Sequence, residues 1–149
     1  MARPSTDRTT DPALCTCANL RMATRTVTQA FDAALAPAGV KATQFTLMAT
    51  LNKLGEAPLT QLAERLVMDR TTLTRNLKPL IDRGFIDTAS GDDRRVRNLK
   101  LSKQGTKVLT KALPLWQKVQ KRVIAGLGHE RWQTLLDDLA IAVSVTRQD

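Results

Sequence analysis

Apolar side chains return every three or four residues in six stretches of the chain, which is the spacing of one buried face of an α-helix. The predicted helices span residues 12–36, 43–54, 60–66, 70–83, 103–126 and 129–146. Residue types that cap helix N-termini stand at or just before five of these starts: Asp11, Thr43, Thr60, Asp69 and Ser102. In the first helix, Leu20 and Val27 belong to the stripe that we expect to face inward. The pattern predicts a mainly helical protein.

The pattern changes after residue 84. Leu99 and Leu101 alternate with Arg97 and Lys100, and a period of two is typical of a strand with one apolar face. Residues 85–88 supply a partner strand, and turn-forming residues separate the two. Two short helices followed by a hairpin define a winged helix-turn-helix. The expected fold class is therefore mainly α, an α+β winged helix-turn-helix with six helices and a two- to three-stranded β-wing.

The apolar faces of the terminal helices exceed what one small winged helix can cover. Burial against a second copy of the chain is the economical solution. We therefore predict one compact domain with three functional regions. Residues 1–12 form a flexible N-terminal tail, residues 13–42 and 103–149 form a helical dimerisation region, and residues 43–102 form the DNA-binding region.

The chain carries a formal net charge of +9, and its pI is about 10.3. A basic surface attracts polyanions, because it releases the counterions that are condensed on them. No apolar run approaches the roughly 20 residues that span a bilayer, and the polar N-terminus has no apolar signal core. We expect a cytoplasmic protein that binds double-stranded DNA and not membranes.

The fourth predicted helix carries its polar residues on one face. A helix fits the major groove, where its N-terminal residues reach base edges. Arg75 is the best candidate for a bidentate contact with guanine, whereas Arg70 and Lys78 suit phosphates. Threonine side chains suit phosphates, base edges or thymine methyl groups. The candidate DNA contacts on this helix are Arg70, Thr71, Thr72, Thr74, Arg75 and Lys78. The alternative is a merely solvated helix face.

Pro79 lies inside this helix, where it removes a backbone donor and crowds the preceding turn. We expect a kink near Arg75, after the part of the helix that would enter DNA.

The tip of the hairpin is the second candidate contact. Arginines on a thin loop can enter the minor groove, where the electrostatic potential is most negative. Arg94, Arg95 and Arg97 are the candidates. Asp93 would be repelled by phosphate, so we interpret it as a brace that accepts hydrogen bonds from an arginine or from loop amides. The alternative is an ordinary exposed hairpin.

Residues 93–105 resemble the wing signature of the MarR family of bacterial transcription regulators. That signature is D-x-R, three residues, L-x-L-[T/S], two residues, G. Its positions fall on Asp93, Arg95, Leu99, Leu101 and Gly105. The preceding stretch, LTQLAERLVMDRTTLTRNLKPLIDRGFI, also resembles the helix-turn-helix of that family.

The resemblance implies a homodimer that binds pseudo-palindromic promoter DNA, usually as a repressor. It implies that the terminal helices form the dimer and that Arg95 enters the minor groove. Many members release DNA when a small aromatic acid or another amphipathic compound binds between the dimerisation and DNA-binding parts. The chain departs from the usual pattern at Pro79, and its hairpin tip lacks a proline that is common there.

A ligand pocket is harder to locate. Arg25, Phe31, Phe45 and Trp116 are the candidates, at the junction of the first, second and fifth predicted helices. An aromatic carboxylate would bind there with Arg25 as its counter-ion. The alternative is that the aromatic residues belong to the core.

Cys15 and Cys17 are the only cysteines, and they lie near the start of a helix, which lowers the pKa of a thiol. Structural packing, redox sensing and metal binding all remain open. Residues two apart in a helix point about 200° apart, which disfavours a bridge between them. A bridge to a partner subunit remains open.

The sequence predicts neither an enzyme nor a cofactor or metal site. A His-based catalytic site would have to rest on His129, the only histidine in the chain. The spacing of the cysteines matches no zinc motif. Two rivals to a specific regulator are an architectural protein that binds DNA without sequence preference and a protein-interaction module built on a winged helix.

Overall fold

The computed structural model describes residues 8–90 and 97–147. Within them lie six α-helices: α1 (Thr16–Leu35), α2 (Ala42–Leu54), α3 (Leu59–Leu66), α4 (Arg70–Asp82), α5 (Lys103–Leu127) and α6 (His129–Thr146). Three strands form one sheet: β1 (Ala57–Pro58), β2 (Ile86–Ser90) and β3 (Arg97–Leu101). Short 3-10 helices lie at η1 (Arg8–Thr10), η2 (Pro12–Leu14) and η3 (Ala36–Ala38). The prediction of a mainly helical winged helix-turn-helix is confirmed.

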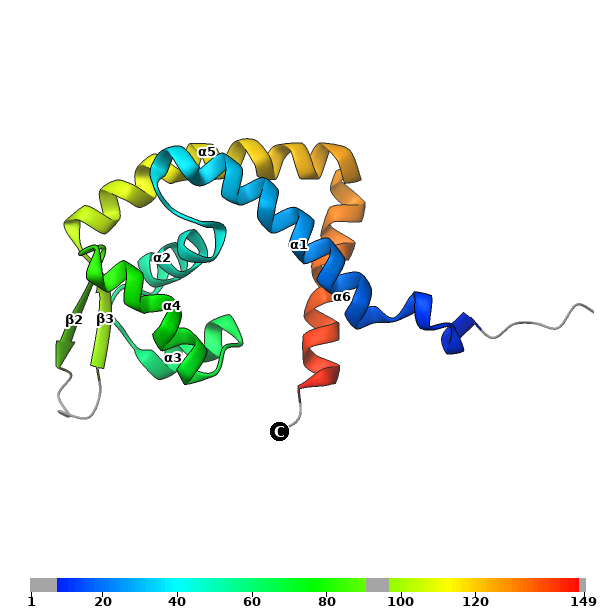
Figure 1. The fold of residues 1–149 in the computed structure, drawn as a ribbon, viewed down its shortest axis with the longest axis horizontal. Helices are drawn as coiled ribbons and strands as arrows, with labels where there is room; N and C mark the ends of the chain where they lie inside the picture. The colour runs from blue at the N-terminus through cyan, green and yellow to red at the C-terminus, as the bar shows by residue number, and fades with distance from the viewer. Residues whose placement is uncertain (1–7, 91–96, 148–149) are drawn as a thin grey trace, which may run out of the picture.

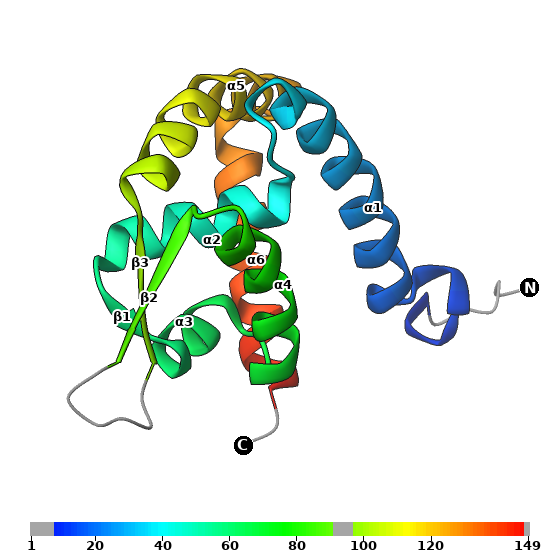
Figure 2. The same cartoon turned by 60° about the vertical axis from the view of Figure 1, so that its left-hand side comes forward.

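The helices divide the molecule into two parts (Figure 1). Helices α2, α3 and α4 gather beside the sheet at one end. Helix α5 leads away from the sheet, the C-terminal end of α1 meets α5 and the rest of α1 diverges from it, and α6 descends from the far end of α5 (Figure 2). Helix α5 is therefore the element that joins the winged helix-turn-helix to the terminal helices.

The sheet has the strand order β1-β3-β2 and is antiparallel throughout. Strands β2 and β3 pair from Ile86 opposite Leu101 to Ser90 opposite Arg97. Strand β1 adds only two residues on the other side of β3, with Ala57 opposite Leu99. Because β1 is an edge strand, its proline costs the ladder little.

The core lies inside the helix-turn-helix. The largest fully buried side chains come from the end of α1 and from α2, α3 and α4: Leu35, Leu47, Met48, Leu51, Leu62, Leu73, Leu77 and Leu80. Helix α6, by contrast, has no buried residue. The inward face predicted for α1 is also wrong in part, because Leu20 and Val27 are exposed. Within residues 8–90 and 97–147, these two side chains of α1 are left uncovered.

Helix α1 begins later than predicted. Asp11 caps a 3-10 turn instead, and its side chain accepts a hydrogen bond of 2.9 Å from the amide of Ala13. The α-helix then starts at Thr16, with Cys15 at the N-cap position.

Helix α2 begins one residue before the predicted cap, so Thr43 lies inside the helix. Lys41 occupies the N-cap position, and its amide donates to the Gln44 side chain at 3.0 Å. The amide of Ala42 donates to Asp32 Oδ1 at 2.7 Å. A carboxylate on α1 therefore caps α2, and sequence patterns within α2 do not reveal this.

Helix α3 also begins early. Pro58 is its N-cap residue and Leu59 its first residue, so the predicted cap Thr60 lies inside the helix. The extended backbone of β1 ends at Pro58, and this fixes the start of the helix.

Two predicted caps are confirmed. Asp69 caps α4, and the Ser102 side chain accepts a hydrogen bond from the Gly105 amide at the start of α5. Pro79 does not end α4, which continues through it to Asp82.

Gly105 lies where α5 crosses the chain between α4 and β2. A Cβ atom at this position would overlap the Phe85 carbonyl group. The Ser102 amide donates to the same carbonyl oxygen at 3.0 Å. The last residue of the wing signature is therefore glycine because two backbones meet there.

We predict opposite effects of adding a methyl group at two glycines of α5. Gly105→Ala should lower the free energy of unfolding by about 3 kcal/mol, because backbone cannot move aside as a flexible side chain can. Gly126→Ala should raise it by roughly 0.5–1 kcal/mol, since nothing lies within 4 Å of the added atom and alanine favours the helix. Urea unfolding of both variants is the measurement. Equal effects would contradict this account.

Candidate nucleic-acid interface

The turn between α3 and α4 is unusually tight. Val67 adopts a left-handed conformation, with φ of 53°. The amide of Met68 donates to the Ala63 carbonyl at 2.9 Å, and the amide of Val67 donates to that of Glu64 at 3.2 Å. A β-branched residue is strained in this region of backbone space. The small side chain of Ala63 suits the close approach of the two helices.

Asp69 ties down the first turn of α4. Its Oδ1 accepts a hydrogen bond of 2.8 Å from the Thr72 amide, and its Oδ2 accepts one of 2.5 Å from the Thr72 hydroxyl. These bonds, first that from the Thr72 side chain, hold the pKa of Asp69 below its ordinary value. The cap is therefore ionised at neutral pH, and its contribution to stability is lost only as the pH falls through that lowered pKa.

Five of the six residues predicted on α4 lie together on its outer face. A shallow groove there is lined by Leu59, Arg70, Thr71, Thr74, Arg75, Lys78, Ile81 and Asp82. Thr72 is the exception, because it is half-buried and its hydroxyl donates to Asp69. The sequence periodicity therefore located the polar face, but not the one threonine that serves the cap.

The cations on this face differ in their partners. Lys78 Nζ forms an exposed ion pair of 2.7 Å with Asp82. Such a pair stabilises a fold little, so a phosphate can replace it. Arg70 and Arg75 make no side-chain hydrogen bond or ion pair within residues 8–90 and 97–147. Two free guanidinium groups therefore lie in the first two turns of α4.

The wing lies at the same edge of the molecule. Figure 2 shows the open ends of β2 and β3 pointing in the same direction as the first turn of α4. Asn98 on β3 donates to Glu56 at 3.1 Å, which fastens the wing to the segment before α3. Arg97 opens β3, whereas Asp93, Arg94 and Arg95 lie outside the described residues.

The C-terminal end of α4 is also fixed. The Phe85 amide donates to the Leu80 carbonyl at 2.8 Å, and the Gly84 amide donates to that of Ile81 at 2.9 Å. Gly84 has φ of 69°, so this is a Schellman motif with glycine at the left-handed position. The Ser102 hydroxyl donates to the Gly84 carbonyl at 2.6 Å, which ties the same turn to α5.

Sequence reasoning missed Arg83. Its Nη1 donates to the Gly39 carbonyl at 2.7 Å, and its Cζ lies 4.3 Å from the centre of the Phe85 ring. Gly39 follows η3, 44 positions earlier in the sequence. No pattern within α4 indicates a partner so distant.

The four predicted pocket residues lie on α1 (Arg25 and Phe31), α2 (Phe45) and α5 (Trp116). The Phe45 and Trp116 rings stack 5.6 Å apart, and Phe45 is buried in the core. Phe31 is half-buried on α1. Arg25 instead lines a groove between α1 and α6 with Arg21 and Cys17, among others. The two stacked rings therefore pack α2 against α5.

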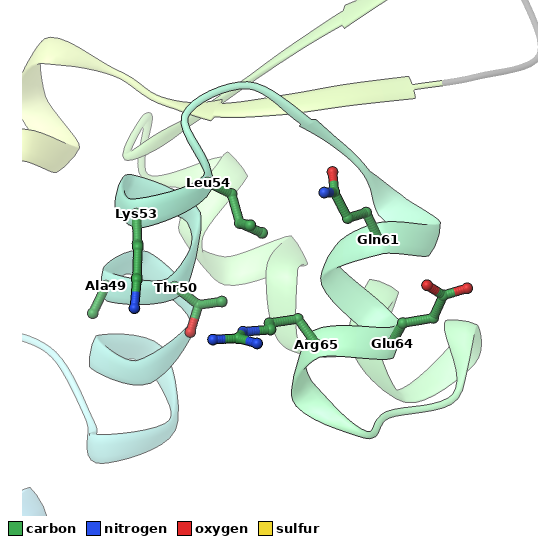
Figure 3. A pocket seen from close by; sticks show the side chains of 7 residues that line it. All are labelled: Ala49, Thr50, Lys53, Leu54, Gln61, Glu64 and Arg65. Carbon is green, nitrogen blue, oxygen red and sulfur yellow. The ribbon is translucent and has the colours of Figure 1, made fainter.

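A second groove lies between α2 and α3 (Figure 3). Ala49, Thr50, Lys53 and Leu54 line it from α2, and Gln61, Glu64 and Arg65 line it from α3. Figure 3 shows the Arg65 side chain reaching towards Thr50, while Glu64 points away from that space. The groove therefore combines apolar side chains with two cations.

Cys15 and Cys17 are both exposed, and both thiols are free. Cys15 is not helical, with ψ of 117° at the N-cap position, so the 200° argument for two helical residues does not apply to this pair. Within the described part of the chain, no group of three or more metal-binding side chains comes together. No helix there is long and apolar enough to cross a membrane.

A short basic helix held at both ends beside a β-wing defines a winged-helix protein of the DNA-binding class. The family model named MarR family matches residues 40–96. The DNA-bound structure of the transcriptional regulator MosR from M. tuberculosis is 36% identical to this chain, with a TM-score of 0.80. The match covers 90% of this chain and 99% of MosR. The chain belongs to the MarR family of DNA-binding transcriptional regulators.

More distant structures share the fold. Mutant MarR from E. coli, complexed with operator DNA, is 20% identical with a TM-score of 0.77, and the match covers 85% of this chain and 92% of MarR. The transcriptional repressor CouR, bound to a 23-mer DNA duplex, is 23% identical with a TM-score of 0.80, over 95% of this chain and 99% of CouR. Among proteins with curated descriptions, none matches the sequence.

Proposed function

We propose that this regulator binds a pseudo-palindromic operator as a homodimer and represses transcription there. The observation that carries the proposal is the outer face of α4. On that face, Arg70 and Arg75 have no side-chain partner among the described residues, and Asp69 caps the helix that presents them. A dimer seated on promoter DNA would repress by excluding other proteins from the same site.

The residues of this face would have different tasks. Arg75, in the second turn, would read a guanine with two hydrogen bonds, which is the commonest specific contact in the major groove. Arg70 and Lys78 would hold phosphates on either side and fix the register without specifying a base. Thr71 and Thr74 would contact phosphates or thymine methyl groups, while Thr72 serves the cap.

Arginines of the wing would enter the adjacent minor groove. Arg97 begins β3, and Arg94 and Arg95 precede it in the sequence. Asp93 would brace them. Since the ends of β2 and β3 face the same way as the first turn of α4, a wing and a helix from one subunit can engage neighbouring grooves (Figure 2).

A second copy would cover the apolar side chains that the terminal helices leave open. These exposed side chains are Leu14, Leu20, Met22, Val27, Leu113, Leu127, Leu135, Leu136, Ile141, Val143 and Val145. All lie on α1, α5, α6 or the short turn before α1. So many neighbouring large apolar side chains are typical of an interface, and a two-fold dimer covers them with the same surface.

A small aromatic acid would release the DNA. The groove between α2 and α3 supports this proposal better than the residues selected from the sequence. Its apolar side chains suit a ring, and Lys53 and Arg65 suit a carboxylate (Figure 3). An acid bound there would contact α3, the first helix of the helix-turn-helix.

Oxidation is a second candidate signal, and the exposure of both thiols favours it. A peroxide would oxidise Cys15 and Cys17 to a disulfide and be reduced to water, either within the chain or between subunits. Both residues lie at the start of α1, Cys15 at its N-cap position and Cys17 in its first turn.

We predict that Arg75→Ala relaxes base preference at one position of each half-site. The loss should be about 1–3 kcal/mol on the preferred base and small on the others. Arg70→Ala is the matched control, because it removes a phosphate contact from the same face. It should weaken all duplexes alike and reduce the salt slope by about one. Fluorescence anisotropy on duplexes substituted at single positions measures both. A uniform loss for Arg75→Ala would contradict its role.

We predict that benzoate or one of its hydroxylated relatives lowers the affinity of the protein for its operator. Combined Lys53→Ala and Arg65→Ala should raise the acid concentration for half-release about tenfold, because the charged hydrogen bonds to the carboxylate are lost. Arg25→Ala, a charge removed from the α1–α6 groove, is the control and should leave that concentration unchanged. If Arg25→Ala raised that concentration and the variant at Lys53 and Arg65 did not, the acid would bind between α1 and α6 instead.

We predict that peroxide weakens DNA binding through the cysteines. The double variant Cys15→Ser and Cys17→Ser should keep full affinity in the presence of peroxide, whereas the wild-type protein should lose it and recover in dithiothreitol. Measuring operator affinity before and after oxidation decides the matter. A double variant that responds like the wild type would remove the cysteines from the signal.

A further inference from the structure

Three consecutive residues tie the C-terminal end of α4 to α5 and to the segment after α1, and we refer to Arg83, Gly84 and Phe85 as the α4 anchor. Gly84 and Phe85 bind α5, because their carbonyls accept hydrogen bonds from the Ser102 hydroxyl and the Ser102 amide. On the side of the anchor, both hydrogen bonds are made by backbone carbonyls, so most substitutions of Gly84 or Phe85 would keep the acceptor atoms. Arg83 is different, because it contributes its side chain.

The Arg83 side chain reaches in another direction, to the segment that follows α1. Its Nη1 donates to the Gly39 carbonyl at 2.7 Å. Among the described residues, no other hydrogen bond joins the segment 36–41 to α4 or its anchor. The segment itself follows α1, and its 3-10 helix η3 contacts both α1 and α5, while Ala38 is buried in the core.

Both partners of Arg83 are held in place. Gly39 has φ of 73°, and a Cβ atom there would lie 3.2 Å from a guanidinium nitrogen of Arg83. The Phe85 ring, over which the guanidinium lies at 4.3 Å, is buried in the core. The planar group is therefore fixed both by a hydrogen bond and by a cation–π contact, which a lysine side chain cannot reproduce together.

A small change at this contact would move the opposite end of α4, which is the end that would meet DNA. Arg83 lies twelve residues after Thr71, a separation of about 18 Å along a helix. A tilt of about 10° at the anchored end would move the base-reading end by about 3 Å, which is close to one base-pair step. A small tilt of α4 at Arg83 therefore causes a large displacement of its first turn relative to the duplex.

We propose that Arg83 is a positioning residue that sets the angle of α4 against the terminal helices, and so fixes the half-site spacing that the dimer accepts. The inference rests on the proposed function, because it requires two copies on two half-sites. Moving one half-site by one base pair shifts it by about 3.4 Å and rotates it by about 35°. A dimer with fixed recognition helices rejects that change, whereas one with loosened helices accepts it.

The experiment compares operators with the best half-site spacing and with one base pair added or removed. Wild type, Arg83→Ala and Arg83→Lys are measured by anisotropy, with thermal unfolding to confirm that each is folded. For Arg83→Ala we expect the preference for the best spacing to fall about fivefold or more, while base preference within each half-site is unchanged. Arg83→Lys keeps the charge and should lose most of the same preference.

Lys107→Ala removes an exposed cation from α5, outside the faces assigned to DNA, to the effector and to the second subunit, and it serves as the control. It should leave the spacing preference as it is in the wild type, whatever it does to affinity. If Arg83→Ala and Arg83→Lys both fold and keep the wild-type preference, the inference is wrong. If Arg83→Ala weakens every spacing equally and lowers the salt slope by about one, Arg83 is a phosphate contact and the inference is wrong. If the wild-type protein showed no preference for any half-site spacing, the proposed binding as a dimer would be wrong, and the inference about Arg83 would be wrong as well.

Discussion

The recognition helix α4 is held at both ends by groups outside it, and the rest of the structure depends on this constraint. Asp69 satisfies its first turn, and the Schellman motif at Gly84 satisfies its last. At that last turn, α5 approaches so closely that Gly105 must lack a side chain. Because the ends are fixed, the polar face between them is preorganised and needs no ordering when DNA arrives.

The same constraint explains the division of labour in the molecule. The core closes around α2, α3 and α4, where the largest buried side chains lie, and α6 contributes none of them. Helix α5 joins the winged helix-turn-helix at one end to α6 at the other (Figure 1), and exposed large apolar side chains lie on α1, α5 and α6. The terminal helices contact the winged helix-turn-helix through α5, through Asp32 at the cap of α2, and through the contact between Arg83 and Gly39.

The sequence predicts the features that depend on neighbouring residues, and it misses the features that depend on contacts between residues distant in the sequence. Helix spacing, the Asp69 and Ser102 caps and the polar face of α4 all follow from neighbours within a few residues. The starts of α2 and α3 do not, because Asp32 on α1 caps the one and pairing of β1 with β3 fixes the other. The stacking of the Phe45 and Trp116 rings is another contact between distant residues, and only the packed structure shows it.

The most direct test of the account is selection of bound sequences from random duplexes at about 150 mM salt. A specific dimer predicts an enriched palindrome whose half-sites lie about one helical turn apart, or a multiple of it, because two-fold protein symmetry is copied into the operator. Binding without any enriched sequence, or enrichment of one unpaired half-site, would contradict the claim that paired α4 helices read this operator.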